Sequence, residues 1–167
     1  TPDEVWAQTL DVNVMAHVRA ARLLMPAWVE RGHGRFVVTA SAAGLLSMIG
    51  AAPYSVSKHA AVAFAEWLSI TYGDKGIVVQ ALCPQGVQTA MLDQAGELRD
   101  LLSAQGALTP EAVAELVWEA MQDDPFLILP HAQVAEFYRR RASDTDAWLR
   151  GMRRLQAGFD QLKEQNT

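Results

Sequence analysis

A tyrosine and a lysine stand one helical turn apart, Tyr54 and Lys58, in the segment Ala-Ala-Pro-Tyr-Ser-Val-Ser-Lys. A spacing of four residues places both side chains on one face of a helix. A phenol has a reference pKa near ~10, and a fixed cation beside it lowers that pKa because it favours the phenolate. The pair is therefore a candidate general acid and base. Taken alone, it also fits an ordinary helix surface, since ionisable groups gather at functional sites only in a statistical sense.

Three short apolar runs, over residues 35–40, 77–82 and 126–129, alternate with longer stretches of helical pattern. Runs that are apolar at nearly every position are typical of strands covered on both faces, as in a parallel sheet flanked by helices. The order along the chain is helix, strand, helix, strand, helices, strand and helices. We therefore predict an α/β fold wound around a parallel sheet, with residues 1–167 forming a single domain.

The helices expected around these strands have recognisable features. Thr1 is placed to cap a helix over residues 1–31, and Thr109 and Ser143 are placed to cap later helices. The helix expected over residues 53–72 is apolar nearly all round, so it needs cover on two sides. One side can be the sheet, and a second copy of the chain is a candidate for the other.

The residues that follow the first two predicted strands are candidates for a binding site, because ligands of open parallel sheets lie beyond the carboxyl ends of the strands. Ser41 follows the first strand and stands thirteen residues before Tyr54, and the segment from Pro84 to Thr89 follows the second. A short loop would let the Ser41 hydroxyl meet the Tyr54 phenol. By itself, a serine at a strand end is also a common turn or cap residue.

Together these residues resemble the short-chain dehydrogenase/reductases. The resemblance lies in Ser41, in Tyr54 and Lys58, in Asn13 within Asp-Val-Asn-Val, and in the strand and turn that end at residues 84–89. It covers nearly the whole chain, but only the second half of such an enzyme. It implies the C-terminal part, about three strands, of a Rossmann-like parallel sheet with flanking helices. It also implies an NAD(P)-dependent oxidoreductase that interconverts an alcohol and a ketone or aldehyde.

The resemblance assigns a role to each residue of the motif. Tyr54 would exchange a proton with the substrate oxygen, and Ser41 would donate a hydrogen bond to that oxygen. Lys58 would bind the nicotinamide ribose and lower the pKa of Tyr54. Asn13 would support a water that links Lys58 to solvent, although a helical asparagine bonded to backbone is an ordinary structural feature too.

The turn after the second strand matches the segment that lies against the nicotinamide in such enzymes. Pro84, Gly86, Val87 and Thr89 would therefore contact NAD or NADP, together with Tyr54 and Lys58. Gln85 departs from the glycine usual at its position, which puts the approach of the turn to the cofactor in doubt. Without the resemblance, the segment is simply a turn that ends a strand.

The stretch from residue 90 to residue 108 would cover the substrate as a mobile lid. Its apolar side chains favour a hydrophobic alcohol or ketone, and they fit ordinary helix packing equally well: Met91, Leu92, Leu98, Leu101 and Leu102.

A glycine-rich phosphate-binding turn between a strand and a helix is missing from this sequence, since Gly32-His33-Gly34 precedes a strand. We therefore expect the first strand to have an unpaired side and this chain alone to bind no cofactor tightly. An alternative function is a non-catalytic remnant that dimerises. In either case residues 1–31 and 53–72 are the expected contacts of a homodimer or homotetramer. The sequence does not decide between NAD and NADP, and it does not identify the substrate.

Composition excludes several other classes of protein. The 167 residues are 50% hydrophobic and 20% charged, and the net charge of −5 gives no attraction for nucleic acid. No run approaches the ~18 apolar residues of a membrane span. Cys83 is the only cysteine, which excludes an internal disulfide and favours the cytoplasm. The four histidines lack the spacing of a metal site.

Overall fold

A computed structural model describes the backbone of residues 1–93 and 106–165, with side chains through residue 161. The chain divides into two compact units, residues 1–131 and residues 132–167. The single domain expected from the sequence stays a prediction.

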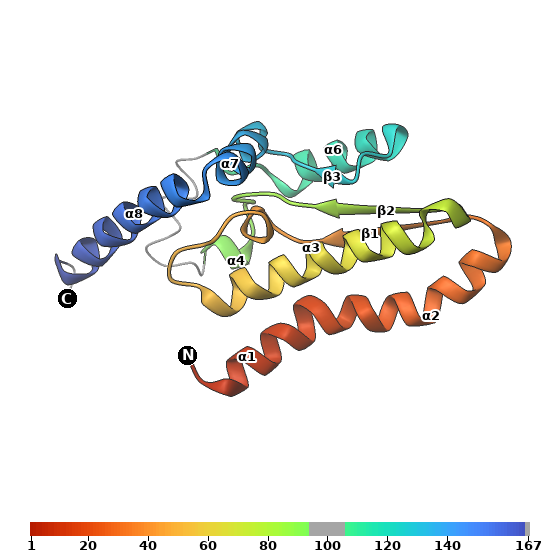
Figure 1. The fold of residues 1–167 in the computed structure, drawn as a ribbon, viewed down its shortest axis with the longest axis horizontal. Helices are drawn as coiled ribbons and strands as arrows, with labels where there is room; N and C mark the ends of the chain where they lie inside the picture. Colours follow the sequence, from red (N-terminus) through yellow and green to blue (C-terminus); the bar gives the residue numbers. More distant parts are fainter. Residues whose placement is uncertain (94–105, 166–167) are drawn as a thin grey trace. The chain divides into compact units, whose positions relative to one another are not determined.

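The first unit contains a parallel sheet of three strands in the order β1-β2-β3, with helices before and between the strands (Figure 1). Its elements are α1 (Asp3–Leu10), η1 (Asp11–Met15), α2 (Ala16–Arg31), β1 (Gly34–Thr39), η2 (Ala42–Gly44), α3 (Ala52–Tyr72), η3 (Gly73–Lys75), β2 (Ile77–Leu82), α4 (Ala90–Asp93), α6 (Pro110–Asp123) and β3 (Leu127–Ile128). The α/β fold, the three parallel strands and the unpaired outer side of β1 within the described sheet are as the sequence predicts.

The register of the sheet brings the carboxyl ends of β1 and β2 together. Gly34 pairs with Ile77 at one end, and Thr39 pairs with Leu82 at the other. In Figure 1 both strands run toward the end of the sheet at which α3, drawn in yellow, begins. The loops after the strands and the first turn of α3 therefore share one edge of the fold, which is where α/β proteins place their ligands.

The core lies between α3 and the sheet. The α3 residues Ala61, Ala65 and Leu68 are at most 1% exposed, and small residues at two of these positions let the helix approach β2 closely. The other side of α3 is only partly covered by α1 and α2, because Trp67 and Ile70 are 53% and 79% exposed. The prediction that this helix needs a second neighbour is therefore met only in part within this chain.

The N-terminal helix differs from the prediction in two ways. It begins at Asp3 after Pro2, which has an extended backbone, so Thr1 does not cap it. The helix is also interrupted by one π-helical turn over Asp11–Met15. Hydrogen bonds to the fifth residue back accommodate one extra residue, a change that hydrophobic spacing does not reveal.

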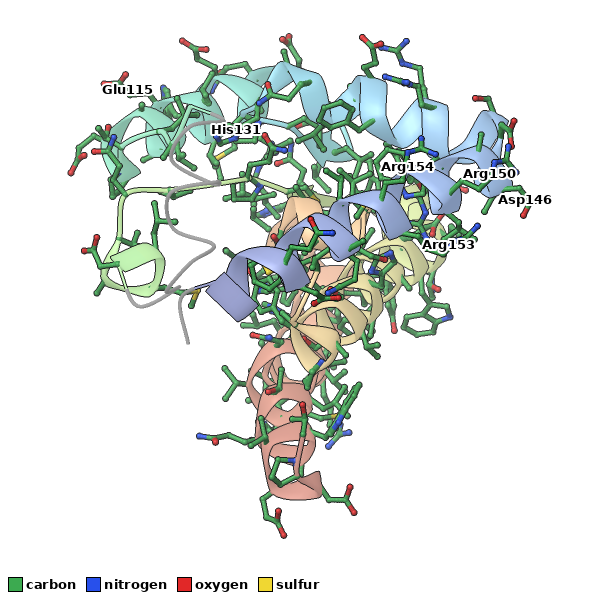
Figure 2. The ribbon with its side chains drawn as sticks, turned by 90° about the vertical axis from the view of Figure 1, so that its left-hand side faces the viewer. Glu115, His131, Asp146, Arg150, Arg153 and Arg154 are labelled. Carbon is green, nitrogen blue, oxygen red and sulfur yellow. The ribbon has the colours of Figure 1, made fainter. Side chains whose placement is uncertain are left out.

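The second unit is a pair of helices, α7 (Ala132–Ser143) and α8 (Thr145–Gln165), which are joined by packing of the Phe137 and Trp148 rings. The predicted cap at Ser143 is wrong. Asp144 caps α8 instead, because its Oδ1 lies 2.8 Å from the Ala147 N–H, while Ser143 belongs to the end of α7. Figure 2 shows Arg150, Arg153 and Arg154 along α8.

The predicted cap at Thr109, which precedes α6 in the first unit, is confirmed by its bond to the Ala112 N–H.

Gly76 controls how the chain enters β2, and it gives a direct test of the packing at this edge. Its φ of +81° lies in the left-handed region, and a Cβ there would collide with the carbonyl oxygen of Gly32. Gly76→Ala should therefore lower the free energy of unfolding by at least about 2 kcal/mol in urea denaturation. The control is Gly73→Ala, because Gly73 has helical dihedrals and open space around it. Equal losses in the two variants would contradict the assignment.

Cys83 is fully buried at the end of β2, and burial raises its pKa to about 11. Because the thiolate is the reactive form, iodoacetamide at neutral pH should alkylate Cys83 at least ~100-fold more slowly in the folded chain than in urea. Cys83→Ala with a new cysteine at the exposed position Ala114 provides the accessible comparison. Similar rates for the two folded proteins, followed by mass spectrometry, would show that Cys83 is not protected as described.

Candidate active site

Tyr54 and Lys58 lie in the first two turns of α3, on one face as their spacing predicts. The Lys58 Nζ is 5.6 Å from the centroid of the Tyr54 ring. Tyr54 is partly exposed and Lys58 is 8% exposed. Among the described residues, none forms a hydrogen bond with the Tyr54 hydroxyl, which leaves the phenol available to a ligand.

The Lys58 ammonium is held at the carboxyl end of β1. Its Nζ donates to the carbonyl oxygen of Thr39 at 3.0 Å. Burial lowers the pKa of Lys58, because an ammonium loses hydration in the interior. An ammonium has three N–H donors, and the described protein groups accept from one of them. The others are available for hydroxyl oxygens such as those of a ribose.

Ser41 lies in the buried first part of the loop that leads from β1 to α3. Its Oγ accepts from the Ala43 N–H at 3.1 Å, so it caps the short helix η2, and it lies 3.5 Å from the Pro84 carbonyl oxygen. The loop packs tightly on α3 because Gly44 has no side chain: a Cβ there would lie 2.5 Å from the Lys58 carbonyl oxygen. The structure thus places Ser41 beside the turn after β2, in a loop that packs against the helix carrying Tyr54.

Asn13 lies in the π-helical turn η1 and contacts α3 through Ser57. Its Nδ2 donates to the Ser57 Oγ at 2.9 Å, and that hydroxyl donates to the Tyr54 carbonyl oxygen at 2.9 Å. Ser57 is fully buried. A π-helical turn is frequent at functional sites, and here it places an amide against the first turn of α3.

The turn after β2 is tied to several segments. The Pro84 carbonyl accepts from the Ala42 N–H at 2.8 Å, and the Gly86 carbonyl accepts from the Leu108 N–H at 3.1 Å. Val87 also bridges to Leu108. The Thr89 Oγ1 donates to the Val87 carbonyl oxygen at 3.2 Å, at the start of α4.

The predicted lid over residues 90–108 is described only at its two ends. Met91 is 70% exposed and Leu92 is buried, both in α4. Leu98, Leu101 and Leu102 lie outside the described residues, so the lid stays a prediction.

Two polar residues near the site were missed by the motif. Ser57 belongs to the Tyr-Ser-Val-Ser-Lys segment, but nothing in its type shows that it receives the Asn13 amide. His17, one turn beyond Asn13, lies near Lys58: burial lowers its pKa first, and the Lys58 charge lowers it further. A histidine within an amphipathic helix gives no signal of such a neighbour.

The described residues give no sign of a metal or of a membrane span. No group of three or more His, Cys, Asp or Glu side chains lies where it could hold a metal ion in that part of the chain. No helix in the same part combines the length and the apolar character needed to cross a bilayer.

Known proteins resemble this chain in sequence. A dehydrogenase of 1-deoxy-11-beta-hydroxypentalenate from Streptomyces exfoliatus is 34% identical over 153 residues, which cover 88% of this chain and 53% of the relative. Epidermal retinol dehydrogenase 2 of Homo sapiens is 33% identical over 133 residues, covering 77% of this chain and 42% of the relative. The chain thus spans about half the length of the curated relatives it matches.

Solved structures resemble it as well. A short chain dehydrogenase/reductase from Burkholderia phymatum in complex with NAD superposes with a TM-score of 0.78 at 28% identity, covering 88% of this chain and 60% of that one. A short-chain dehydrogenase from Sphingobium yanoikuyae in complex with NADPH shares the fold, with a TM-score of 0.73 at 21% identity, covering 91% and 57%. Since the family model described as short chain dehydrogenase also matches residues 1–100, this chain belongs to the short-chain dehydrogenase family.

Proposed function

We propose that the protein containing this chain is an NAD(P)-dependent oxidoreductase that interconverts an alcohol and a ketone or aldehyde. The observation that carries the proposal is the buried Lys58 ammonium, fixed on the Thr39 carbonyl and 5.6 Å from the Tyr54 ring. Relatives named as dehydrogenases and a similar structure that contains NAD support it.

The residues present fit the nicotinamide half of such a cofactor. Lys58 has ammonium donors for ribose hydroxyls, and the Pro84–Thr89 turn offers backbone groups at the same edge of the sheet. Among the described residues, no glycine-rich turn leads from a strand into a helix N-terminus, where a pyrophosphate would bind. When bound, the nicotinamide would supply or accept the hydride.

The residues of this chain manage the proton and the orientation of the substrate. Tyr54 donates a proton to the substrate oxygen in reduction and accepts it in oxidation, while Lys58 stabilises the negative charge on the phenolate. Ser41 donates a hydrogen bond to the same oxygen and fixes its position. Asn13 holds the first turn of α3 through Ser57 and supports a water between Lys58 and solvent.

A second copy of the chain is the proposed partner on the exposed side of α2 and α3, in a homodimer or homotetramer. An apolar groove of about 440 Å³ lies between the two helices, and Trp67, which lines it, is 53% exposed. Leu23 on α2 and Ile70 on α3 are exposed as well, at 79% each, on other faces of the same helices. An apolar surface of this kind is typical of an association site.

Location in the cytoplasm stays a prediction that rests on the single cysteine. The alternative function remains a non-catalytic protein that dimerises.

Tyr54→Phe tests the chemistry in the protein's natural full-length form. Loss of the phenol should lower kcat for hydrophobic alcohols and ketones by about 10²- to 10⁴-fold, because general acid–base catalysis contributes that much. Cofactor binding, followed by calorimetry with NAD(H) and NADP(H), should change little. Tyr72→Phe, at the far end of the same helix, is the matched control. Turnover by Tyr54→Phe at the wild-type rate would remove the proposed role of Tyr54.

A wild-type full-length protein with no turnover on any substrate would favour the non-catalytic alternative.

Trp67→Glu tests the association. A charge on this exposed apolar side should weaken self-association by about thirtyfold or more in sedimentation velocity, since buried tryptophans are frequent binding hot spots. Trp118→Glu is the control, because Trp118 is equally an exposed tryptophan but lies on α6. A protein that is monomeric throughout, or one that both variants weaken alike, would rule out this surface as the interface.

A further inference from the structure

His131 lies just beyond β3 and is 5% exposed, and the motif of the family gives it no role. Figure 2 shows it where the chain leaves β3, with α6 beside it. Its Nδ1 accepts a hydrogen bond from the Gln85 backbone N–H at 3.2 Å. A buried imidazole thus reaches the residue at which this chain departs from the family's usual glycine.

The bond continues the β2–β3 ladder at the point where backbone pairing stops. The Cys83 N–H donates to the Ile128 carbonyl oxygen at 2.9 Å, which is the last backbone bond between the strands among the described residues. Pro84 has no N–H, so Gln85 carries the next donor on this strand. An imidazole nitrogen takes the place that a strand carbonyl would otherwise occupy.

The geometry also selects a tautomer. Because Nδ1 accepts a hydrogen bond, the proton of the neutral ring must be on Nε2. Nε2 is buried and forms no well-aligned hydrogen bond among the described residues. Burial lowers the pKa of His131, and the backbone of Gly106 and of Gly86 near the ring opposes part of that shift, so the net direction favours the neutral ring.

Three consecutive residues of the turn are each held by a different segment. Ala42 in η2 donates to Pro84, His131 accepts from Gln85, and Leu108 donates to Gly86. Of these three contacts, the middle one is made by a side chain, so a substitution of His131 can remove it without changing the course of the backbone.

We propose that His131 is a positioning residue that fixes the Pro84–Gly86 turn in the conformation that receives the nicotinamide end of the cofactor. The cofactor part rests on the function proposed above. The hydrogen bond and the tautomer stand independently of it.

Three substitutions of His131 distinguish the effect of the Nδ1 acceptor from the effect of the ring as a whole. His131→Asn can present its Oδ1 near the position of Nδ1 and so keep an acceptor for Gln85. His131→Gln carries its amide one carbon further out, near the position of Nε2, and His131→Leu removes all polar atoms. The thermal unfolding temperature of each variant shows whether the substitution destabilises the fold. Comparing the Asn variant with the Gln variant then separates loss of the acceptor from loss of stability, because both replace the ring with an amide.

The first measurement needs no activity. Long-range ¹⁵N–¹H spectra should show His131 as the neutral ring with its proton on Nε2. Hydrogen exchange of the Gln85 amide should become about tenfold faster in the Gln and Leu variants and remain near wild type in Asn. A proton on Nδ1, or Asn and Gln variants that exchange alike, would overturn the hydrogen-bond role.

The second measurement uses the natural full-length protein. The Kd for NAD(H) or NADP(H) should rise about tenfold in His131→Gln and stay within about threefold of wild type in His131→Asn, with kcat at saturating cofactor changed less than the Kd. Unchanged Kd in all variants, with the exchange result as expected, would overturn the cofactor part of the proposal. If the wild-type protein bound no nicotinamide cofactor, the proposed function would fail, and the amide-exchange result would still decide whether His131 holds the turn.

Discussion

Burial of the Lys58 ammonium at the carboxyl end of β1 is the interaction on which the rest of the site depends. A cation taken out of water is costly unless it finds acceptors, and here the Thr39 carbonyl supplies one and the face of the Tyr54 ring a weaker attraction. This fixes α3 in rotation and in height above the sheet. Tyr54, one turn earlier, lies on the same face of the helix, and no residue in the described part of the chain forms a hydrogen bond with its hydroxyl.

Two close approaches make that placement possible. Gly44 lets the loop after β1 lie directly on the Lys58 backbone, which brings Ser41 to the helix. The parallel pairing of Thr39 with Leu82 makes both strands end at the same level, so the Ala42 N–H can reach the Pro84 carbonyl. Backbone hydrogen bonds therefore join the ends of the two strands at this edge of the sheet, beside the polar side chains of the site.

The sequence predicts most of the fold because the relevant signals are local. The apolar runs over 34–39 and 77–82 are strands within one residue of their expected bounds, and Thr109 caps its helix as expected. The errors occur where two local solutions compete. Asp144 and Ser143 are adjacent residues that can both cap a helix, and the position of the last turn of α7 decides between them. Likewise, the π-helical turn at Asp11–Met15 leaves the amphipathic pattern almost unchanged.

The residues of the candidate site also fall into two groups, those that the sequence reveals and those that it does not. Ser41, Tyr54 and Lys58 are recognisable because their mutual spacing is short and is set within a single strand, loop and helix. The sequence does not reveal the roles of three other residues, Ser57, His17 and His131. Each of them interacts with a residue 40 or more positions away in the chain, as Ser57 does with Asn13 and His131 with Gln85. No local pattern records which distant partner will be close.

By itself, the sequence determined the class of fold, the order of its elements and the residue types that can transfer a proton, because periodicity and short spacings encode these. Only the tertiary structure decided which buried polar atoms meet: the ammonium of Lys58 with a strand-end carbonyl, the amide of Asn13 with Ser57, and the imidazole of His131 with the turn after β2. The physical reason is that a hydrogen bond depends on distances of about 3 Å between atoms, and packing of helices on the sheet sets these distances across long separations in the chain.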